Sequence, residues 1–191
     1  MKIKYNAPTV LSYAFICAAV MVLSQYFLPG LARAWFMIPG KGNFSVSSPR
    51  DWITLLTHAA GHSSWSHLFS NFSLILLIGP MLEESYGSLV LLAMIVITTI
   101  VTGVLNVFFF TTGLMGASGV VFMMILLASF TNFSRGEIPL TFILVLVLYL
   151  GDQLLKSLGV DNISHFAHIA GGFCGSLFGF VFPPRKYGRN Y

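Results

Sequence analysis

Charged residues are scarce in this chain, and their scarcity limits the classes of protein to which it can belong. Only 8% of its 191 residues are Asp, Glu, Lys or Arg, whereas 56% are hydrophobic. A water-soluble domain of this size needs a charged, solvated surface, which this composition cannot supply. Several apolar stretches reach the roughly 20 residues that a helix needs to cross a bilayer core about 30 Å thick. The sequence therefore predicts a polytopic membrane protein.

Cysteine is nearly absent as well. Cys17 and Cys174 both lie in apolar runs, where a free thiol behaves as a small hydrophobic side chain. We therefore expect neither a disulfide nor a thiolate metal site. The net charge of +4 comes from basic residues that cluster near the chain ends. We interpret this charge as a membrane-topology signal and expect no nucleic-acid partner.

Six apolar runs are predicted to be transmembrane helices. Lipid offers no partner for an unpaired backbone group, and runs of this length and hydropathy favour helices over barrel strands. The sequence thus predicts an all-α, six-span bundle that forms a single membrane domain over residues 1–191. The predicted spans cover residues 9–28, 66–83, 88–110, 118–133, 139–157 and 164–182.

A long loop, residues 29–65, separates the first two predicted spans and is the least helical stretch of the sequence. Its apolar segment from Trp35 to Ile38 and its other tryptophans are typical of the membrane interface. A cytoplasmic N-terminus would place six basic residues inside and four outside, which favours cytoplasmic positions for both termini. The six are Lys2, Lys4, Arg135, Arg185, Lys186 and Arg189. The four are Arg33, Lys41, Arg50 and Lys156.

Polar side chains at membrane depth are costly, so those that a span retains are informative. The stretch THAAGHSSWSHLFSN leads into the second span. His67 and Asn71 are four residues apart and therefore share one helix face. Ser63 or Ser64 is suited to cap this helix, which leaves His62 in the approach loop. Taken alone, the pattern favours hydrogen bonding between helices.

A second polar position opens the fourth span, where the sequence reads GLMGASGVV. Gly116 and Gly119 have no Cβ, and small residues at the start of a span usually allow another helix to approach. Taken alone, this stretch favours packing. Ser118, however, would begin a helix, where free N–H groups and the helix dipole favour a developing negative charge.

The last span carries a glycine every four residues, at Gly171, Gly175 and Gly179. This spacing predicts a ridge for close helix packing. His168 lies three residues before Gly171, on the same face, so its imidazole should point at whichever helix the ridge touches. If Ser118 lies on that helix, the chain holds a nucleophile, a base and polar groups for an oxyanion, which acyl-transfer chemistry requires.

Three segments carry a resemblance to a known family. GASG at 116–119, AHIAGGFCG at 167–175 and HSSWSHLFSN at 62–71 resemble the signature segments of the rhomboid intramembrane serine proteases. The segments occur in the family's order and on the expected spans, and the resemblance covers about residues 50–180. It implies a six-span helical core that cleaves peptide bonds in or near transmembrane segments of other membrane proteins.

The resemblance also implies roles for individual residues. Ser118 corresponds to the family's nucleophile and His168 to its general base, a dyad that has no carboxylate as third member. His67 and Asn71 correspond to residues that line the oxyanion site, and no metal or cofactor is implied. His62 matches a histidine near the active-site cavity.

Other positions are expected to support this site. Gly116 and Gly171 match places where helices approach closely, and Phe122 could pack against the imidazole of His168, where many relatives have tyrosine. Glu83 resembles the first residue of a Glu-x-x-x-Gly element at the end of the second span. The segment DWITLLTH departs from the family, because Ile53-Thr54 occupies the place of a Trp-Arg pair. This departure leaves the anchoring of the long loop open.

Two other functions remain open at this level. A catalytically inactive, rhomboid-like protein could bind transmembrane clients, although the intact serine and histidine argue against it. A metal-dependent membrane protein could use the pairs His58/His62 and His165/His168, but the sequence contains no His-Glu-x-x-His motif. A six-span chain with no seventh span is typical of bacterial members, and we expect the inner membrane as its location.

Overall fold

The computed structural model describes residues 2–130, 138–150 and 162–184, and within these ranges the chain is helical with no β-strand. Basic residues of the topology argument such as Arg135, Lys156 and Arg185 lie outside the described ranges. The described elements are α1 (Pro8–Val22), a π-helical turn (Leu23–Phe27), α2 (Leu31–Trp35), α3 (Pro49–Thr57), a 3-10 turn (His58–Ala60), α4 (Trp65–Tyr86), α5 (Ser88–Phe109), α6 (Ser118–Ala128), α7 (Leu140–Val145), a second π-helical turn (Leu146–Leu150) and α9 (Asn162–Val181).

Among the described residues, three helices are long and apolar enough to cross a membrane: Pro8–Phe27, which joins α1 to its π-helical turn, together with α4 and α5. All three, and α9, begin and end within three residues of predicted spans. The fourth predicted span, 118–133, is shorter than expected, because α6 ends at Ala128. The later parts of the spans 118–133 and 139–157 fall on residues outside the described ranges.

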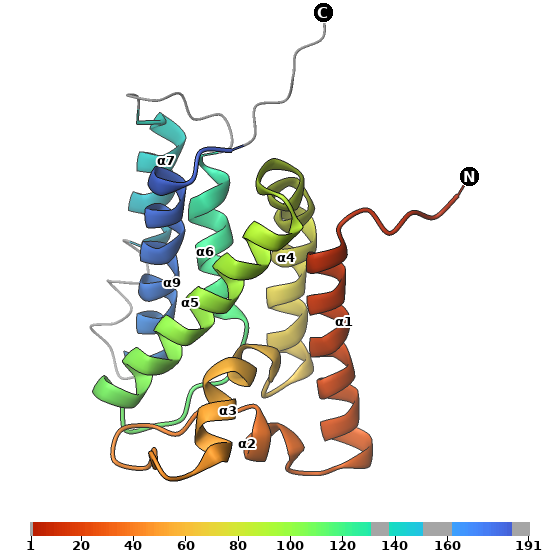
Figure 1. The fold of residues 1–191 in the computed structure, drawn as a ribbon, viewed down its shortest axis with the longest axis vertical. Helices are drawn as coiled ribbons and strands as arrows, with labels where there is room; N and C mark the ends of the chain where they lie inside the picture. The colour runs from red at the N-terminus through yellow and green to blue at the C-terminus, as the bar shows by residue number, and fades with distance from the viewer. Residues whose placement is uncertain (1, 131–137, 151–161, 185–191) are drawn as a thin grey trace, which may run out of the picture.

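Helix α6 forms the centre of the bundle. It contacts α4, α5, α7 and α9, and every residue from Gly119 to Leu127 is buried. A helix that is apolar on all sides is stable only where other helices surround it. Figure 1 shows α5 running obliquely in front of α6, with α2 and α3 gathered at the lower end of the molecule.

The predicted glycine ridge of α9 packs directly on α6. A Cβ at Gly171 would overlap the carbonyl group of Gly119, and a Cβ at Gly175 would overlap that of Met123. Both contacts are between backbones, which have no rotamer with which to move aside. The backbones of the two helices are therefore in direct contact, which requires glycine at these positions.

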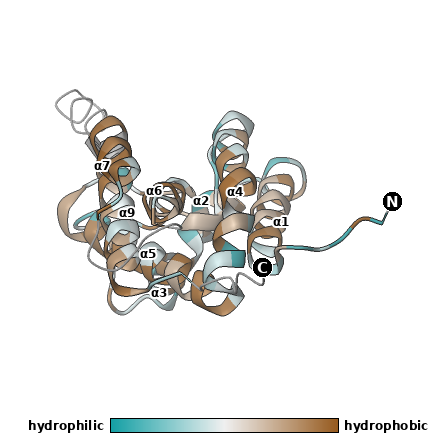
Figure 2. Ribbon diagram, turned by 90° about the horizontal axis from the view of Figure 1, so that it is seen from above, coloured by the Kyte–Doolittle hydropathy of each residue, from teal (hydrophilic) through white to brown (hydrophobic). Residues whose placement is uncertain are grey.

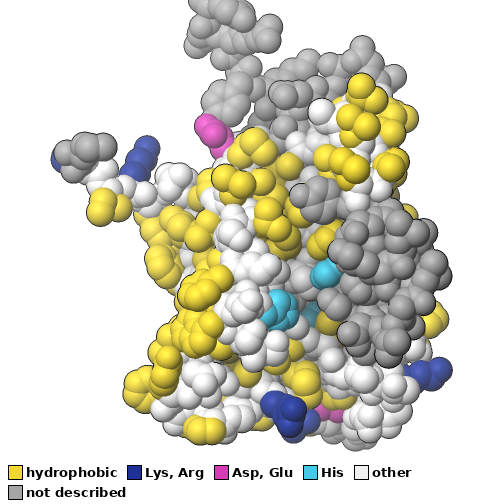
Figure 3. Space-filling model, turned by 180° about the vertical axis from the view of Figure 1, so that it is seen from behind, with side chains coloured by type: hydrophobic (Ala, Val, Ile, Leu, Met, Phe, Trp, Pro, Cys, Tyr) yellow, Lys and Arg dark blue, Asp and Glu magenta, His cyan; other side chains and the backbone are white. Residues whose placement is uncertain are grey.

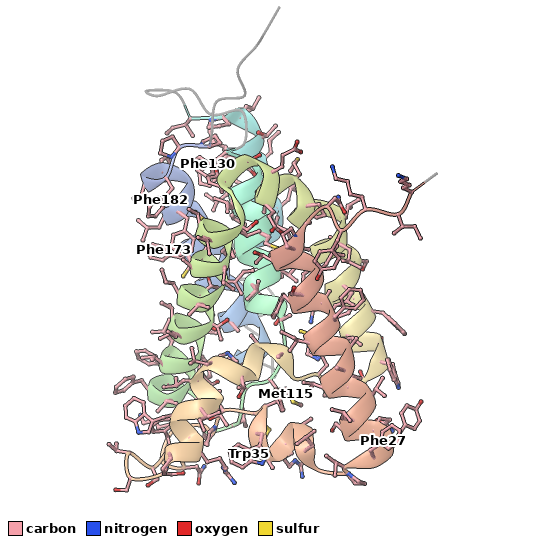
Figure 4. All side chains as sticks on the ribbon, turned by 45° about the vertical axis from the view of Figure 1, so that its right-hand side comes forward. Phe27, Trp35, Met115, Phe130, Phe173 and Phe182 are labelled. Atoms are coloured by element: carbon pink, nitrogen blue, oxygen red, sulfur yellow. The ribbon has the colours of Figure 1, made fainter. Side chains whose placement is uncertain are left out.

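Aromatic rings join the C-terminal end of α6 to the neighbouring helices α7 and α9. Phe130, just after α6, packs against Phe142 of α7 and Phe180 of α9 with ring centroids 4.7 and 4.8 Å apart. Figure 4 shows Phe130 toward the upper end of the bundle, whereas Met115 and Trp35 both lie toward the lower end. The ends of α6 thus differ: aromatic packing surrounds one, and Ser118 begins the other.

Much of the outer surface is apolar, as expected beside lipid. On α7, Leu140 is 68% exposed and Val147, in the turn that follows, is 62% exposed. Figure 2 shows hydrophobic residues along most of α7, whereas the segment that precedes α1 is mostly hydrophilic.

The long loop is more ordered than the sequence analysis predicted, because it contains α2, α3 and a 3-10 turn. Ser48 caps α3 by accepting a hydrogen bond from the N–H of Asp51. The buried carboxylate of Asp51 accepts a bond of 2.8 Å from the N–H of Ser45, and the indole of Trp52 donates to the carbonyl of Val46 at 2.9 Å. Local hydrogen bonds therefore anchor α3 in the absence of a Trp-Arg pair.

Glu83, near the end of α4, joins that helix to the start of α1. Its carboxylate accepts hydrogen bonds from the N–H groups of Thr9 at 2.8 Å and Val10 at 2.9 Å. These N–H groups belong to the first turn of α1, where a helix has free donors and favours a negative charge. Gly87 follows with a φ of 89° and allows the sharp reversal into α5.

Candidate active site

Ser118 begins α6 after a connection that the long loop holds in place. Ile38 and Leu114 exchange two backbone hydrogen bonds of 3.0 Å, so the two loops run side by side. The amide nitrogen of Asn106 on α5 also donates to the carbonyl of Thr112 at 3.1 Å. Two other parts of the chain, the long loop and α5, therefore hold the backbone that leads into Ser118.

Gly116, two residues before Ser118, has a conformation that favours glycine, with a φ of 134°. Its N–H donates to the carbonyl of His58 at 2.9 Å. A Cβ at this position would lie 2.6 Å from Cε1 of His67. The imidazole of His67 thus lies against the backbone that leads into Ser118, and only a residue without a side chain leaves room for it.

His67, Asn71 and His62 form one polar cluster at the start of α4. Ser64 caps the helix by accepting a bond of 3.2 Å from the N–H of His67. The side-chain nitrogen of the buried Asn71 lies 3.1 Å from Nε2 of His62, and because an amide nitrogen only donates, Nε2 accepts. The rings of His62 and His67 meet edge to face with centroids 5.0 Å apart.

His168 lies on α9, on the other side of the α6 N-terminus. Its ring stacks on that of Phe122, one turn after Ser118, with centroids 4.3 Å apart and planes 6° apart. Such a parallel contact limits the rotation of the imidazole. A Cβ at Gly119 would lie 3.4 Å from the carbonyl oxygen of Ala167, so the residue after Ser118 lies next to the residue before His168.

The N-terminus of α6 lies inside the bundle, not at its end. A Cβ at Gly119 would approach the methyl group of Thr102 to 3.0 Å, and Thr102 precedes the end of α5 at Phe109 by about 10 Å of helix. Asn71 lies at a similar depth, about 9 Å from the start of α4. Figure 3 shows histidine side chains visible in the middle of one face of the molecule.

Two histidines outside the spans are held neutral by burial. Burial lowers the pKa of His58 to about 4. The pKa of His62 is also lowered to about 4, first by burial and then by the nearby imidazole of His67. Both values lie below the 6.5 of an unperturbed histidine.

The stability of the folded protein should therefore decrease as the pH falls from about 6.5 to about 4. In this window the unfolded chain binds protons that the buried histidines do not, so the free energy of unfolding declines. Thermal unfolding in detergent at pH 7.5 and pH 5 would measure the effect. The variant His62→Gln should show a shallower dependence, and a midpoint that is unchanged or higher at pH 5 would contradict the prediction.

The sequence analysis missed the contribution of His58 to this region. Its imidazole lies between α3 and α5, with Nδ1 3.2 Å from the carbonyl of Thr54 and Nε2 3.5 Å from the hydroxyl of Thr102. Its backbone carbonyl holds Gly116. The imidazoles of His58 and His62 thus have different hydrogen-bond partners. Among the described residues there is no group of three His, Cys, Asp or Glu side chains suited to bind a metal.

The seven residues that the sequence analysis assigned to the site come from the starts of α4 and α6, the segments that lead into these two helices, and α9. His67 contacts the backbone before Ser118, His62 contacts both His67 and Asn71, and His168 stacks on Phe122. His165, half of the second histidine pair considered for a metal, has its backbone in α9, but its side chain lies outside the described part of the structure. The seven are His62, His67, Asn71, Gly116, Ser118, Phe122 and His168.

Comparison with known proteins gives two similarities. A family model described as the Rhomboid domain matches residues 49–185. The rhomboid protease GlpG of Haemophilus influenzae is 26% identical over 129 residues, which cover 66% of this chain and 67% of that protein. The matched range contains α3 to α9 and every residue of the candidate site.

Proposed function

The chain belongs to the rhomboid family and is an integral membrane protein, and on this premise we propose that it is an intramembrane serine endopeptidase with Ser118 as nucleophile and His168 as general base. The observation that carries the proposal is the packing of the α6 N-terminus. Gly116 lies against His67 on one side, and Gly119 lies against Ala167 on the other. Ser118 is between these two contacts.

In the proposed reaction the hydroxyl of Ser118 attacks the carbonyl carbon of a peptide bond. His168 accepts the hydroxyl proton and then donates it to the departing amine, which leaves an acyl-enzyme. Water, deprotonated by His168, then attacks this ester, and His168 returns the proton to the departing oxygen of Ser118. The stack on Phe122 keeps the imidazole in one orientation through both steps.

The negative charge on the attacked oxygen needs positioned donors. No side chain among the described residues caps the N-terminus of α6, so the N–H of Ser118 can donate to this oxygen, and the helix dipole favours the charge. Asn71 uses one hydrogen of its amide nitrogen for His62, which leaves the second for the oxyanion. His67 lies beside the same backbone and completes the group of donors.

The substrates would be transmembrane or juxtamembrane segments of other proteins. A site about 10 Å below the helix ends is compatible with polar groups only if water reaches it, and a substrate helix must unwind locally to expose its bond. The proposal includes a single six-span domain over residues 1–191, with both termini in the cytoplasm of a bacterium and the bundle in the inner membrane.

A fluorophosphonate probe tests the proposed function. The purified protein in detergent should form one covalent adduct, at Ser118, and labelling should disappear when His168 is replaced by alanine. Mass spectrometry of the labelled peptide identifies the residue. A folded protein without an adduct at Ser118 would instead support the catalytically inactive, client-binding alternative.

The variant Asn71→Ala should lower kcat by about 10²–10³-fold, the usual cost of removing one oxyanion donor. KM for a transmembrane substrate should change much less, because the lost bond forms mainly in the transition state. Ser73→Ala is the matched control, since Ser73 is exposed on the same helix and, within the described part of the chain, its hydroxyl bonds only to carbonyls of that helix. Equal kcat values for Asn71→Ala and Ser73→Ala would remove Asn71 from the mechanism.

A further inference from the structure

The 3-10 turn His58–Ala60 connects four elements of the bundle, because it contacts α1, α3, α5 and α6. Two consecutive carbonyl groups of this turn accept hydrogen bonds from distant residues. The carbonyl of His58 accepts from the N–H of Gly116 at 2.9 Å. The carbonyl of Ala59 accepts from the hydroxyl of Tyr13 on α1 at 2.8 Å. One peptide unit thus separates α1 from the backbone that leads into Ser118.

Tyr13 provides the strong polar contact between α1 and this turn. The thiol of Cys17 also points at the carbonyl of Ala59, but at 4.0 Å, and a thiol is a weak donor. Ala59 and Ala60 are buried and have no polar side chain of their own. Apolar contacts with α1 also hold the turn, but among the described residues the Tyr13 hydroxyl is the strong hydrogen-bond donor that α1 provides to it.

The same turn also leads into His62 through Gly61, where a Cβ would lie 2.6 Å from the carbonyl oxygen of Phe36. Gly61 alone separates the turn from His62, and His62 in turn contacts the amide of Asn71, so one residue and one hydrogen bond link the turn to this amide. A shift of the turn would therefore move the backbone before Ser118 and a proposed oxyanion donor together.

We propose that Tyr13 is a positioning residue for the proposed peptidase reaction. Its hydroxyl helps to hold the 3-10 turn, and the turn holds Gly116 through a backbone hydrogen bond and His62 through Gly61. Tyr13 touches neither the substrate nor the reacting atoms. The inference rests on the proposed function, and it assigns to α1, which precedes the matched Rhomboid region, a part in the geometry of catalysis.

The variant Tyr13→Phe removes the hydroxyl and keeps the ring. The rate constant for fluorophosphonate labelling of Ser118 should fall about fivefold, since small displacements of catalytic groups have large effects on rate. The kcat for a transmembrane substrate should fall by a similar factor with KM unchanged. The labelling rate should depend on pH in the same way in the variant as in the parent protein. The part of this dependence that reflects protonation of His168 should not shift, because Tyr13 acts on the other side of Ser118. Replacing Tyr13 by p-aminophenylalanine restores a donor and should recover the rate.

Tyr86→Phe is the matched control, because its buried hydroxyl has no hydrogen-bond partner among the described residues. Tyr86 is the last residue of α4, about 22 Å along the helix from Asn71. Its replacement should therefore leave the labelling rate unchanged. A purely structural role for Tyr13 would lower the labelled fraction but not the rate constant, and that result would overturn the inference. Failure of the parent protein to label at Ser118 would overturn the proposed function, and this inference with it.

Discussion

The variant Ser118→Ala is expected to lose all specific proteolysis of a transmembrane substrate while it keeps its fold. Loss of the nucleophile in a serine protease lowers kcat by about 10⁶-fold, which places any remaining rate below detection in a proteoliposome assay. The side chain of Ser118 is only partly buried at the start of α6, so removal of one oxygen should hardly change thermal unfolding. His168→Ala should reduce cleavage to the same level.

Ser129→Ala is the appropriate control for this experiment. Ser129 follows the last residue of α6, about 16 Å along the helix from Ser118, and its replacement should leave cleavage at the level of the parent protein. Cleavage at the same substrate bond by Ser118→Ala, at more than a trace of the parent rate, would show that another residue is the nucleophile.

The variant Gly171→Ala should be severely impaired in folding, in activity or in both. The added methyl group would overlap the carbonyl of Gly119, and neither backbone has a rotamer that relieves the overlap. Overpacking usually costs about 1–3 kcal/mol and sometimes more, and here α6 and α9 must separate beside Ser118 and His168. We expect a large fall in the unfolding midpoint, and a loss of activity of about 10²-fold in any protein that remains folded.

Gly79→Ala separates this effect from the general consequences of replacing a helical glycine. A Cβ at Gly79 in α4 would approach the side-chain methyl groups of Val10 to 2.9 Å, and a side chain can shift where a backbone cannot. The alanine also favours the helical state by about 1 kcal/mol in both variants. Gly79→Ala should therefore be much milder, and equal effects of the two substitutions would contradict the interpretation of the ridge as backbone contact.

The sequence was a good guide to the long helices, because hydropathy along the chain is a local property. It predicted the limits of Pro8–Phe27, α4, α5 and α9 within three residues. It was less reliable for α6, which ends five residues early at Ala128. An apolar run shows that a segment avoids water, but not whether lipid or other helices surround it. It also missed α3, whose cap depends on Ser48 and Asp51 in a loop rich in turn-forming residues.

The sequence by itself determined the membrane character of this protein, its helical class, and the residue types available for acyl transfer, since all three follow from the identity of side chains. Only the tertiary structure decided that the ridge at Gly171 meets α6, and that His67 lies against Gly116. It alone revealed the bond from the N–H of Gly116 to the carbonyl of His58. Every residue has a carbonyl group, and all except proline have an N–H. A contact between two backbones therefore leaves no pattern in the sequence, and the geometry around Ser118 depends on several such contacts.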